Sequence, residues 1–293
     1  MKLPLLDSDM ARHAIDLLER ALLAPADPDD VDSVDTELIE AVCPLIVAFS
    51  RTYFRQEVQG IDDVPDGKTL IVGNHNAGIT WLEPFGMGAS YYLERGTDQI
   101  IHGLAHDAMM APPLLGNLLS HLGGLRASQE NSRRAFERDR KIFVSPGGNH
   151  EAFRPYRDRY KIDLANRTGF IRLALNCGVS ITPVVFVGGH ETFFVIRSGR
   201  RIARRMGIDK RFRFTTWPLM VGLPWGVFFG PMFHLPLPAK SVVRFLEPVD
   251  LSGYSPDDAN EPAALKEIYR DVTGRMQRAM DEISSKRRFP VLG

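Results

Sequence analysis

A histidine in a glycine-containing turn is the first residue whose surroundings suggest chemistry. His75 lies in the turn Gly73-Asn74-His75-Asn76-Ala77-Gly78, directly after the apolar run Leu70-Ile71-Val72. If that run is a strand, His75 lies at its carboxyl end, where α/β folds bind their ligands. Glu83 follows eight residues later, and a carboxylate on one ring nitrogen raises the basicity of the other. The spacing predicts a general base, with a structural histidine as the simpler alternative.

A second turn combines glycines with charged side chains. The segment Ser145 to Arg154 also follows a short apolar run. Gly147 and Gly148 allow backbone amides to approach a ligand, because glycine has no Cβ. Glu151 and Arg154 add charged groups to the same turn. We expect this turn to bind an acceptor or to stabilise an oxyanion.

Other kinds of catalytic site have little support. The sequence contains no Gly-x-Ser-x-Gly nucleophile motif. Cys43 and Cys177 are far apart and form no CxxC pair, so neither a disulfide framework nor a zinc site is indicated. His102 and His106 have ligand-like spacing, but packing or surface roles are expected for them. The sequence therefore predicts no bound metal.

These candidate residues require an α/β scaffold. Short apolar runs alternate with helical patterns, which predicts a mostly parallel sheet flanked by helices. The expected strands are Leu70–Val72, Ile142–Val144, Ile181–Val187 and Val242–Leu246. The expected helices are Ala11–Leu23, Thr36–Phe54, Pro84–Leu93, Met110–Leu119, Ser128–Arg138 and Ala165–Cys177, followed by a C-terminal amphipathic helix that starts at Ser255-Pro256.

Length and composition indicate one α/β domain with helical additions. The chain has 293 residues, of which 44% are apolar and 25% charged, as in ordinary globular proteins. A chain of this length folds without a metal or disulfide staple. We expect N-terminal helices over 1–56, the α/β domain over 57–253 and a C-terminal helix packed on it over 254–293. The N-terminal helices either pack together around a solvated acidic turn or contact a membrane surface.

The net charge is zero, because 36 basic residues balance 36 acidic ones. This balance argues against a protein devoted to nucleic acid. The charges are nevertheless segregated, with seven acids and no base over Asp27 to Glu40 and a basic block over Arg197 to Arg213. The basic block precedes Phe214 to Ala239, an aromatic segment that prolines interrupt too often for a spanning helix.

The basic block and the aromatic segment together predict an interfacial element. Cations near anionic head groups contribute about 1 kcal/mol each, and aromatic side chains favour the acyl boundary. The alternative is a buried loop over the edge of the sheet with a solvated basic face. The acidic N-terminus is not a secretory signal. We therefore expect a cytoplasmic protein, peripheral on the inner membrane face.

Four sequence features occur in order along the chain, namely Asn74-His75 after a strand, Gly123 to Arg126, Pro146 to Glu151, and Ile181 to Pro183. Taken together, they resemble the glycerolipid acyltransferase superfamily, which contains the lysophosphatidate acyltransferases. The Pro-Gly-Gly form of the third feature, with Arg167 and Gly169-Phe170 downstream, is closer to the monoacylglycerol/diacylglycerol acyltransferase-like branch. The resemblance covers roughly Tyr53 to Val249.

The resemblance implies acyl transfer from a thioester, either acyl-CoA or acyl carrier protein, to a hydroxyl of a glycerolipid or other lipid. No bound cofactor is expected, and His75 would be the general base. The superfamily's mark is a His followed by four residues and an Asp; here Thr80 occupies the fifth position after His75, and Glu83 would replace the Asp. The resemblance also implies direct attack without an acyl-enzyme.

The resemblance further assigns the acceptor side of the site. Arg126 matches the acceptor-binding arginine of the second motif, and Glu151 matches the acid of the third. An arginine suits a phosphate, but a neutral acceptor is equally open, because Gly-Gly-Asn replaces the usual Glu-Gly-Thr. Two other functions remain as alternatives, namely a catalytically inactive lipid-binding protein and a thioesterase or esterase in which His75 activates water. The expected acceptor or oxyanion residues are Asn74, Arg126, Gly147, Gly148, Glu151 and Arg154.

Overall fold

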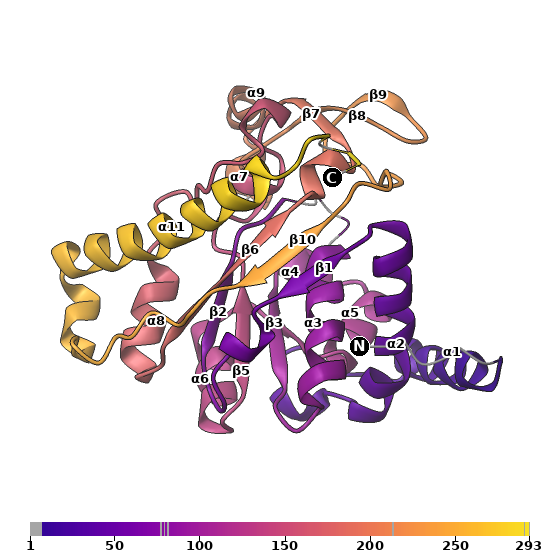
Figure 1. The fold of residues 1–293 in the computed structure, drawn as a ribbon, viewed down its shortest axis with the longest axis horizontal. Helices are drawn as coiled ribbons and strands as arrows, with labels where there is room; N and C mark the ends of the chain where they lie inside the picture. The colour runs from indigo at the N-terminus through magenta and orange to yellow at the C-terminus, as the bar shows by residue number, and fades with distance from the viewer. Residues whose placement is uncertain are drawn as a thin grey trace.

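A seven-stranded sheet lies at the centre of the computed structural model, which describes residues 8–76, 78, 80, 82–212, 214–289 and 291–292. The strand order is β1-β10-β6-β2-β5-β3-β4 (Figure 1). Strands β6, β2, β5, β3 and β4 are parallel to one another, whereas β10 is antiparallel to β6. The predicted mostly parallel sheet is confirmed. The strands are β1 (Glu57–Gln59), β2 (Leu70–Gly73), β3 (Ile101–Ala105), β4 (Gly124–Arg126), β5 (Lys141–Val144), β6 (Ile181–Val187) and β10 (Val242–Phe245).

The central strands are apolar throughout because helices cover both faces of the sheet. Every residue of β6 is buried. Val185 and Val187 contribute to the core on one face, and Val184 and Phe186 to the core on the other. Continuous rather than alternating apolar residues are typical of such doubly covered parallel strands.

One face of the sheet is covered by α6, α8 and α11, and the other by α3, with α1, α2 and α5 beyond it (Figure 1). The apolar stripe of α11 includes Ile268, Val272 and Met276, all buried. The helices are α1 (Ser8–Leu23), α2 (Thr36–Tyr53), α3 (Leu82–Arg95), α4 (Asp107–Met110), α5 (Pro113–His121), α6 (Gln129–Glu137), α7 (Asn149–Ala152), α8 (Gly169–Cys177), α9 (Arg200–Arg205), α10 (Ile208–Phe212) and α11 (Pro262–Ser285).

Some helix boundaries differ from the expected ones for local reasons. The expected helix Met110–Leu119 is divided into α4 and α5, and Pro113 is the first residue of α5. The helix expected from Ala165 begins only at Gly169, because Ala165 and Asn166 have φ angles of 58° and 53°. The C-terminal helix starts at Pro262, after a 3-10 turn over Pro256–Asn260.

The segment expected as an interfacial element or a loop contains a β-hairpin. Strands β8 (Leu219–Gly222) and β9 (Gly226–Phe229) pair with each other, and β8 also pairs with β7 (Phe194–Arg197), which gives a separate three-stranded antiparallel sheet. This sheet and α9 lie at one end of the molecule (Figure 1). Phe228 points inward and is 7% exposed, whereas Phe229 is 58% exposed. Among the helices described here, none has the length and apolar content needed to cross a membrane.

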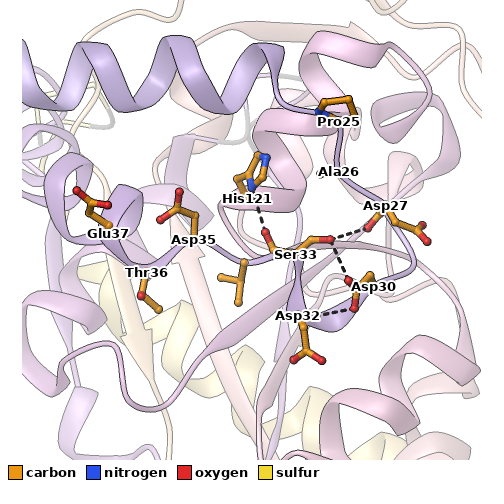
Figure 2. Close-up of a pocket in the computed structure, with 11 residues that line it drawn as sticks. Pro25, Ala26, Asp27, Asp30, Asp32, Ser33, Asp35, Thr36, Glu37 and His121 are labelled. Atoms are coloured by element: carbon orange, nitrogen blue, oxygen red, sulfur yellow. Dashed lines mark hydrogen bonds between the residues drawn. The ribbon is translucent and has the colours of Figure 1, made fainter.

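The acidic turn near the N-terminus is held by local and long-range contacts. An open hollow of about 590 Å³ lies over it, and Figure 2 shows its lining, with Ser33 hydrogen-bonded to the Asp27 carbonyl and the Asp30 carboxylate. Asp35 accepts from the backbone amide of Leu38 at 3.0 Å and caps α2. Asp32 pairs with Arg138 and Arg140, which lie just before β5. These acids therefore stabilise turns and neutralise neighbouring cations.

Candidate active site

Three turns meet at the carboxyl ends of neighbouring strands. Strands β6, β2 and β5 are adjacent and parallel. Their following segments are 188–191, 74–76 and 145–154. Strand spacing is about 4.8 Å, so the side chains of three such turns can share one site. This edge of the sheet is the usual location of ligand sites in α/β folds.

The two asparagines beside His75 fix its turn to β6. The Asn74 side chain makes two hydrogen bonds with the backbone of Phe186, donating to the carbonyl at 3.0 Å and accepting from the amide at 2.8 Å. The Asn76 amide donates to the same carbonyl at 2.8 Å. Both side chains are buried. His75 is therefore held between two anchored residues and is itself only partly buried.

Glu151 connects the second turn to the first. Its side chain is fully buried, and one carboxylate oxygen accepts from the His75 backbone amide at 3.1 Å. The other oxygen accepts from Arg154 and from the Asp163 amide. Burial raises the pKa of Glu151 to about 7, although Arg154 and these hydrogen bonds oppose the rise. The carboxylate therefore fixes the relative position of the two turns.

The two glycines of the second turn are required by close contacts. A Cβ on Gly147 would lie 2.1 Å from the Glu151 carboxylate. Gly148 has a φ of 52°, and its amide donates to the Ser145 carbonyl at 3.1 Å. Arg167 closes the turn from outside by donating to the Pro146 carbonyl at 2.7 Å. The turn thus holds Glu151 against the backbone of His75.

The electrostatic surroundings keep His75 neutral. Burial and the Arg154 guanidinium lower its pKa to about 4. The ring is therefore deprotonated at neutral pH and is able to accept a proton from a substrate.

Glu83 lies in the first turn of α3 and reaches the His75 turn through Asn76. Its carboxyl accepts from the Ser241 hydroxyl at 3.2 Å, and Asn76 is a second hydrogen-bond partner. Burial, assisted by the charge of Glu191, raises its pKa to about 8. A hollow of about 10 Å³, the size of one water molecule, lies beside it. Its lining comprises Phe54, Gln56, Thr80, Glu83, Gly188, Gly189, Thr192 and Ser241.

The third turn contains residues that the sequence interpretation missed. Gly188 and Gly189 follow β6, and a Cβ on Gly189 would lie 2.6 Å from the Asn76 side chain and 2.7 Å from the Glu83 carboxyl. His190 comes next and is 2% exposed. Charges on His75 and Arg154 contribute to lowering the pKa of His190, which places the ring near both. The signal available in the sequence was Gly-Gly-His-Glu directly after the long apolar strand.

Glu191 anchors this third turn from the opposite side. The Tyr160 hydroxyl donates to its carboxylate at 2.8 Å. Arg159 and Arg287 lie 3.5 and 3.8 Å from the same oxygen, so an ion-pair network joins the turn to the chain near the C-terminus. Burial still raises the pKa of Glu191. The network holds the backbone beside His190 in place.

Arg126 lies apart from the other candidate residues. It ends β4, which is separated from β2 by β5 and β3, and three strand spacings amount to about 14 Å. Its guanidinium pairs with Asp29 at 3.1 Å and with Asp107 at 3.6 Å. The structure thus brings together Asn74, His75, Glu151 and Arg154 with the two glycines, while Arg126 lies farther along the same edge.

Comparison with known proteins identifies both the fold and the family of the chain. A solved structure of PlsC, the 1-acyl-sn-glycerophosphate acyltransferase of Thermotoga maritima, has the same fold with a TM-score of 0.54 and 16% identity, covering 95% of this chain and 91% of the other. The model of the diacylglycerol acyltransferase family matches residues 40–249. The chain belongs to the diacylglycerol acyltransferase family, which confirms the branch expected from its motifs.

Relatives with similar sequences include bacterial and animal proteins. An uncharacterised protein of Mycobacterium tuberculosis is 26% identical over 248 residues, which is 84% of this chain and 66% of that protein. The mouse "DGAT1/2-independent enzyme synthesizing storage lipids" is 25% identical over 168 residues, which is 57% of this chain and 49% of that enzyme. The chain thus spans just under two thirds of the mycobacterial relative's length and half of the mouse enzyme's.

Proposed function

We propose that the protein is an O-acyltransferase that moves a fatty acyl group from an acyl thioester to a hydroxyl of a lipid acceptor. Family membership and the fold support acyl transfer as the reaction class. The observation that carries the mechanism is the anchored, neutral His75 at the carboxyl end of β2. The mouse relative's name describes the synthesis of storage lipids, which favours a glycerolipid or a related neutral lipid as acceptor.

His75 is the general base of this reaction. Its neutral ring takes the proton of the acceptor hydroxyl as the oxygen attacks the thioester carbonyl. The tetrahedral intermediate then collapses, the carbon–sulfur bond breaks, and the thiolate takes the proton back from the imidazolium. The products are an ester and a free thiol, and no acyl-enzyme forms. The donor is acyl-CoA or acyl carrier protein.

Glu83 supports His75 through the turn that carries it. Glu83 is hydrogen-bonded to Asn76. The Asn76 amide also donates to the Phe186 carbonyl, and this hydrogen bond holds the His75 turn in place. With a pKa of about 8, the carboxyl is mostly protonated at pH 7. In this step Glu83 keeps its proton and positions the His75 turn through Asn76, and the only proton that moves is the one that His75 takes from the acceptor.

The acceptor side of the site is formed by the second turn. Arg154 is buried and pairs with Glu151. Its positive charge lies near enough to His75 to lower the pKa of that ring. Arg154 is suited to orienting an acceptor oxygen near the base. The Gly147 amide is the candidate oxyanion donor of the glycine pair, since the Gly148 amide already donates to Ser145. A phosphate on the acceptor would be bound by Arg126 only if the acceptor extends along the sheet edge.

A thiol-release assay with a panel of acceptors tests this function. Purified protein is incubated with a long-chain acyl-CoA and with glycerol-3-phosphate, lysophosphatidate, other lysolipids, monoacylglycerol and diacylglycerol in turn. Thiol release together with a new ester in at least one reaction is the expected result. Release of free fatty acid without ester would favour a thioesterase, and binding without turnover would favour a lipid-binding protein. The His75→Ala variant is the matched inactive control.

We also propose that the β8–β9 hairpin and the basic block place the protein on an anionic membrane surface. Apolar side chains on the hairpin and the loop after it are exposed, namely Leu223, Trp225, Val227, Phe229, Met232, Phe233 and Leu235. The basic side chains of α9 are exposed as well. Phe228 packs from the hairpin against Phe153 and Phe193, next to the proposed site. This apolar cluster joins the exposed hairpin to the turn that carries His190.

Vesicle binding separates this surface from the chemistry. Trp225→Ser and Phe233→Ser should each reduce cosedimentation with phosphatidylglycerol vesicles, because they remove apolar area from the bilayer contact. Leu114→Ser is the control, since Leu114 is equally exposed but lies on α5. Raising the ionic strength should release the wild type if the basic block contributes. Binding that is unaffected by both hairpin variants and by salt would contradict this surface.

A further inference from the structure

His190 is a buried imidazole whose ring nitrogens do not contribute hydrogen bonds to the described part of the fold. It is 2% exposed, and within the described part of the chain neither ring nitrogen has a partner at hydrogen-bond geometry. The Glu151 backbone lies near enough to favour the protonated ring slightly, but burial, Arg154 and His75 outweigh this effect and keep the pKa well below its usual range. A buried polar group without a partner is costly and calls for a role.

The turn that carries His190 is fixed on every side. Gly188 has a φ of 120°, and a Cβ there would lie 2.2 Å from the Lys240 carbonyl. The Thr192 hydroxyl donates to the Gly189 carbonyl at 2.6 Å, and Glu191 is bound by the network described above. Such a turn holds the imidazole without contacting its nitrogens, which is the arrangement that a preorganised ligand contact requires.

We propose that His190 is a second substrate-contacting histidine of this site, whose neutral N–H donates a hydrogen bond to the oxyanion that forms during acyl transfer. This inference rests on the proposed function. His75 and His190 follow adjacent parallel strands and both lie near Arg154. One imidazole thus accepts the proton of the acceptor, while the other stabilises the oxygen that becomes negative.

His75 and His190 have different roles in the acyl-transfer step. The acceptor oxygen forms a bond to the thioester carbon, its proton goes to His75, and the carbonyl π electrons move to the oxygen that faces His190. When the carbonyl re-forms, the carbon–sulfur bond breaks and the thiolate recovers the proton from His75. His190 keeps its own proton throughout, so it donates a hydrogen bond to the oxyanion but does not transfer a proton.

The surroundings of His190 strengthen such a donor. The Phe193 ring lies 6.2 Å from the imidazole, centroid to centroid, and Phe193 packs in the apolar cluster with Phe228 from the β8–β9 hairpin. Apolar cover lowers the local dielectric, and a preorganised donor in such a place has a larger effect on the transition state than in water. The Gly148 amide is already bonded to Ser145, so His190 would act together with the Gly147 amide.

Two substitutions distinguish a donor from a packing residue. His190→Phe keeps a ring of similar size but has no N–H, and it should lower kcat about 100- to 1000-fold with little change in KM. His190→Gln keeps an N–H donor and should retain most of that activity, within about tenfold of the wild type. Melting temperatures are measured for both. His102→Gln is the control. His102, in β3, is also buried, but its ring nitrogens are hydrogen-bonded to the Gly123 carbonyl and to Arg140.

The outcomes separate this inference from the proposed function. A wild type that produces no ester with any acceptor contradicts both. An active wild type with His190→Phe within threefold of its kcat overturns the donor role alone. The donor role is also overturned if His190→Gln and His190→Phe lose activity equally and in proportion to their loss of melting temperature. Loss in His190→Phe with retention in His190→Gln and His102→Gln supports the role.

Discussion

Replacing Gly147 by alanine should disconnect the two central turns of the site. The added Cβ would lie 2.1 Å from Glu151 Oε2 and 2.4 Å from its carboxyl carbon, which is far inside van der Waals contact. Glu151 is fully buried, so its side chain has no solvent-filled space to enter. The carboxylate must therefore leave its hydrogen bonds to His75, Arg154 and Asp163.

The magnitude follows from the partners that are left unsatisfied. Breaking a buried ion pair costs about 3–5 kcal/mol, and the two orphaned backbone amides add to the cost. We expect the free energy of unfolding to fall by at least about 3–5 kcal/mol, which corresponds to a fall of roughly 5 °C or more in melting temperature for a chain of this size. Activity should fall further than stability, because the His75 turn loses the contact that positions it.

Urea denaturation and the acyl-transfer assay measure the two effects on the same preparation. Gly169→Ala is the matched control, because no atom lies within 4 Å of a Cβ placed there and the residue begins α8. We expect this control to be neutral or stabilised by up to about 1 kcal/mol. A Gly147→Ala variant with wild-type stability and wild-type activity would refute the role assigned to Glu151.

Three further predictions concern the site. Asn74→Ala should lower the free energy of unfolding by about 1–3 kcal/mol, since it leaves the buried amide of Phe186 without a partner, whereas the Phe186 carbonyl keeps its hydrogen bond from Asn76; an unchanged urea midpoint would contradict this. Glu83 has a folded pKa of about 8 against an ordinary value of 4.5, so its contribution to stability is present below pH 4.5 and is lost as the pH rises to 8. The wild type should therefore lose more stability between pH 5 and 8 than Glu83→Gln, measured in urea, and identical slopes would contradict the raised pKa. His75 has a folded pKa of about 4, so kcat/KM should stay level from pH 7 to 5 and fall near pH 4; a fall centred near pH 6.5 would show an ordinary, exposed histidine.

The sequence predicted the turns that follow the most buried strands. The apolar runs ending at Val72 and Val144 are continuous because both faces of the sheet are covered, and this pattern is visible without a structure. The residues after them, His75 and the two glycines Gly147 and Gly148, could therefore be placed at one edge of the sheet. Their anchoring by Phe186 and Glu151 depends on pairs far apart in the sequence and was not predictable.

His190 was missed although its strand was predicted with the observed bounds. The turn after Val187 contains glycines and a histidine, as does the turn after Val72. What the sequence does not give is the strand order, which places β6 directly beside β2 and pairs Gly73 with Val184. Only this register brings His190 into the surroundings of His75.

The hairpin is hard to predict because prolines are also typical of irregular segments. Pro218 immediately precedes β8, Pro224 lies in the turn between β8 and β9, and Pro231 follows β9. Proline is confined to the ends and turns of strands, where no ladder hydrogen bond is lost. The prolines thus mark the limits of two short strands. Strands β3 and β4 were missed because they are brief and contain His102, Gly103 and Gly124 in place of a continuous apolar run.

The proposed mechanism depends above all on His75 as the base for acyl transfer from a thioester to a lipid hydroxyl. Wild type and His75→Ala are compared in thiol release and ester formation with the best acceptor of the panel, after circular dichroism has shown that both are folded. We predict ester formation by the wild type and a loss of at least about 100-fold in the variant. A folded His75→Ala protein that forms ester at the wild-type rate would contradict this mechanism.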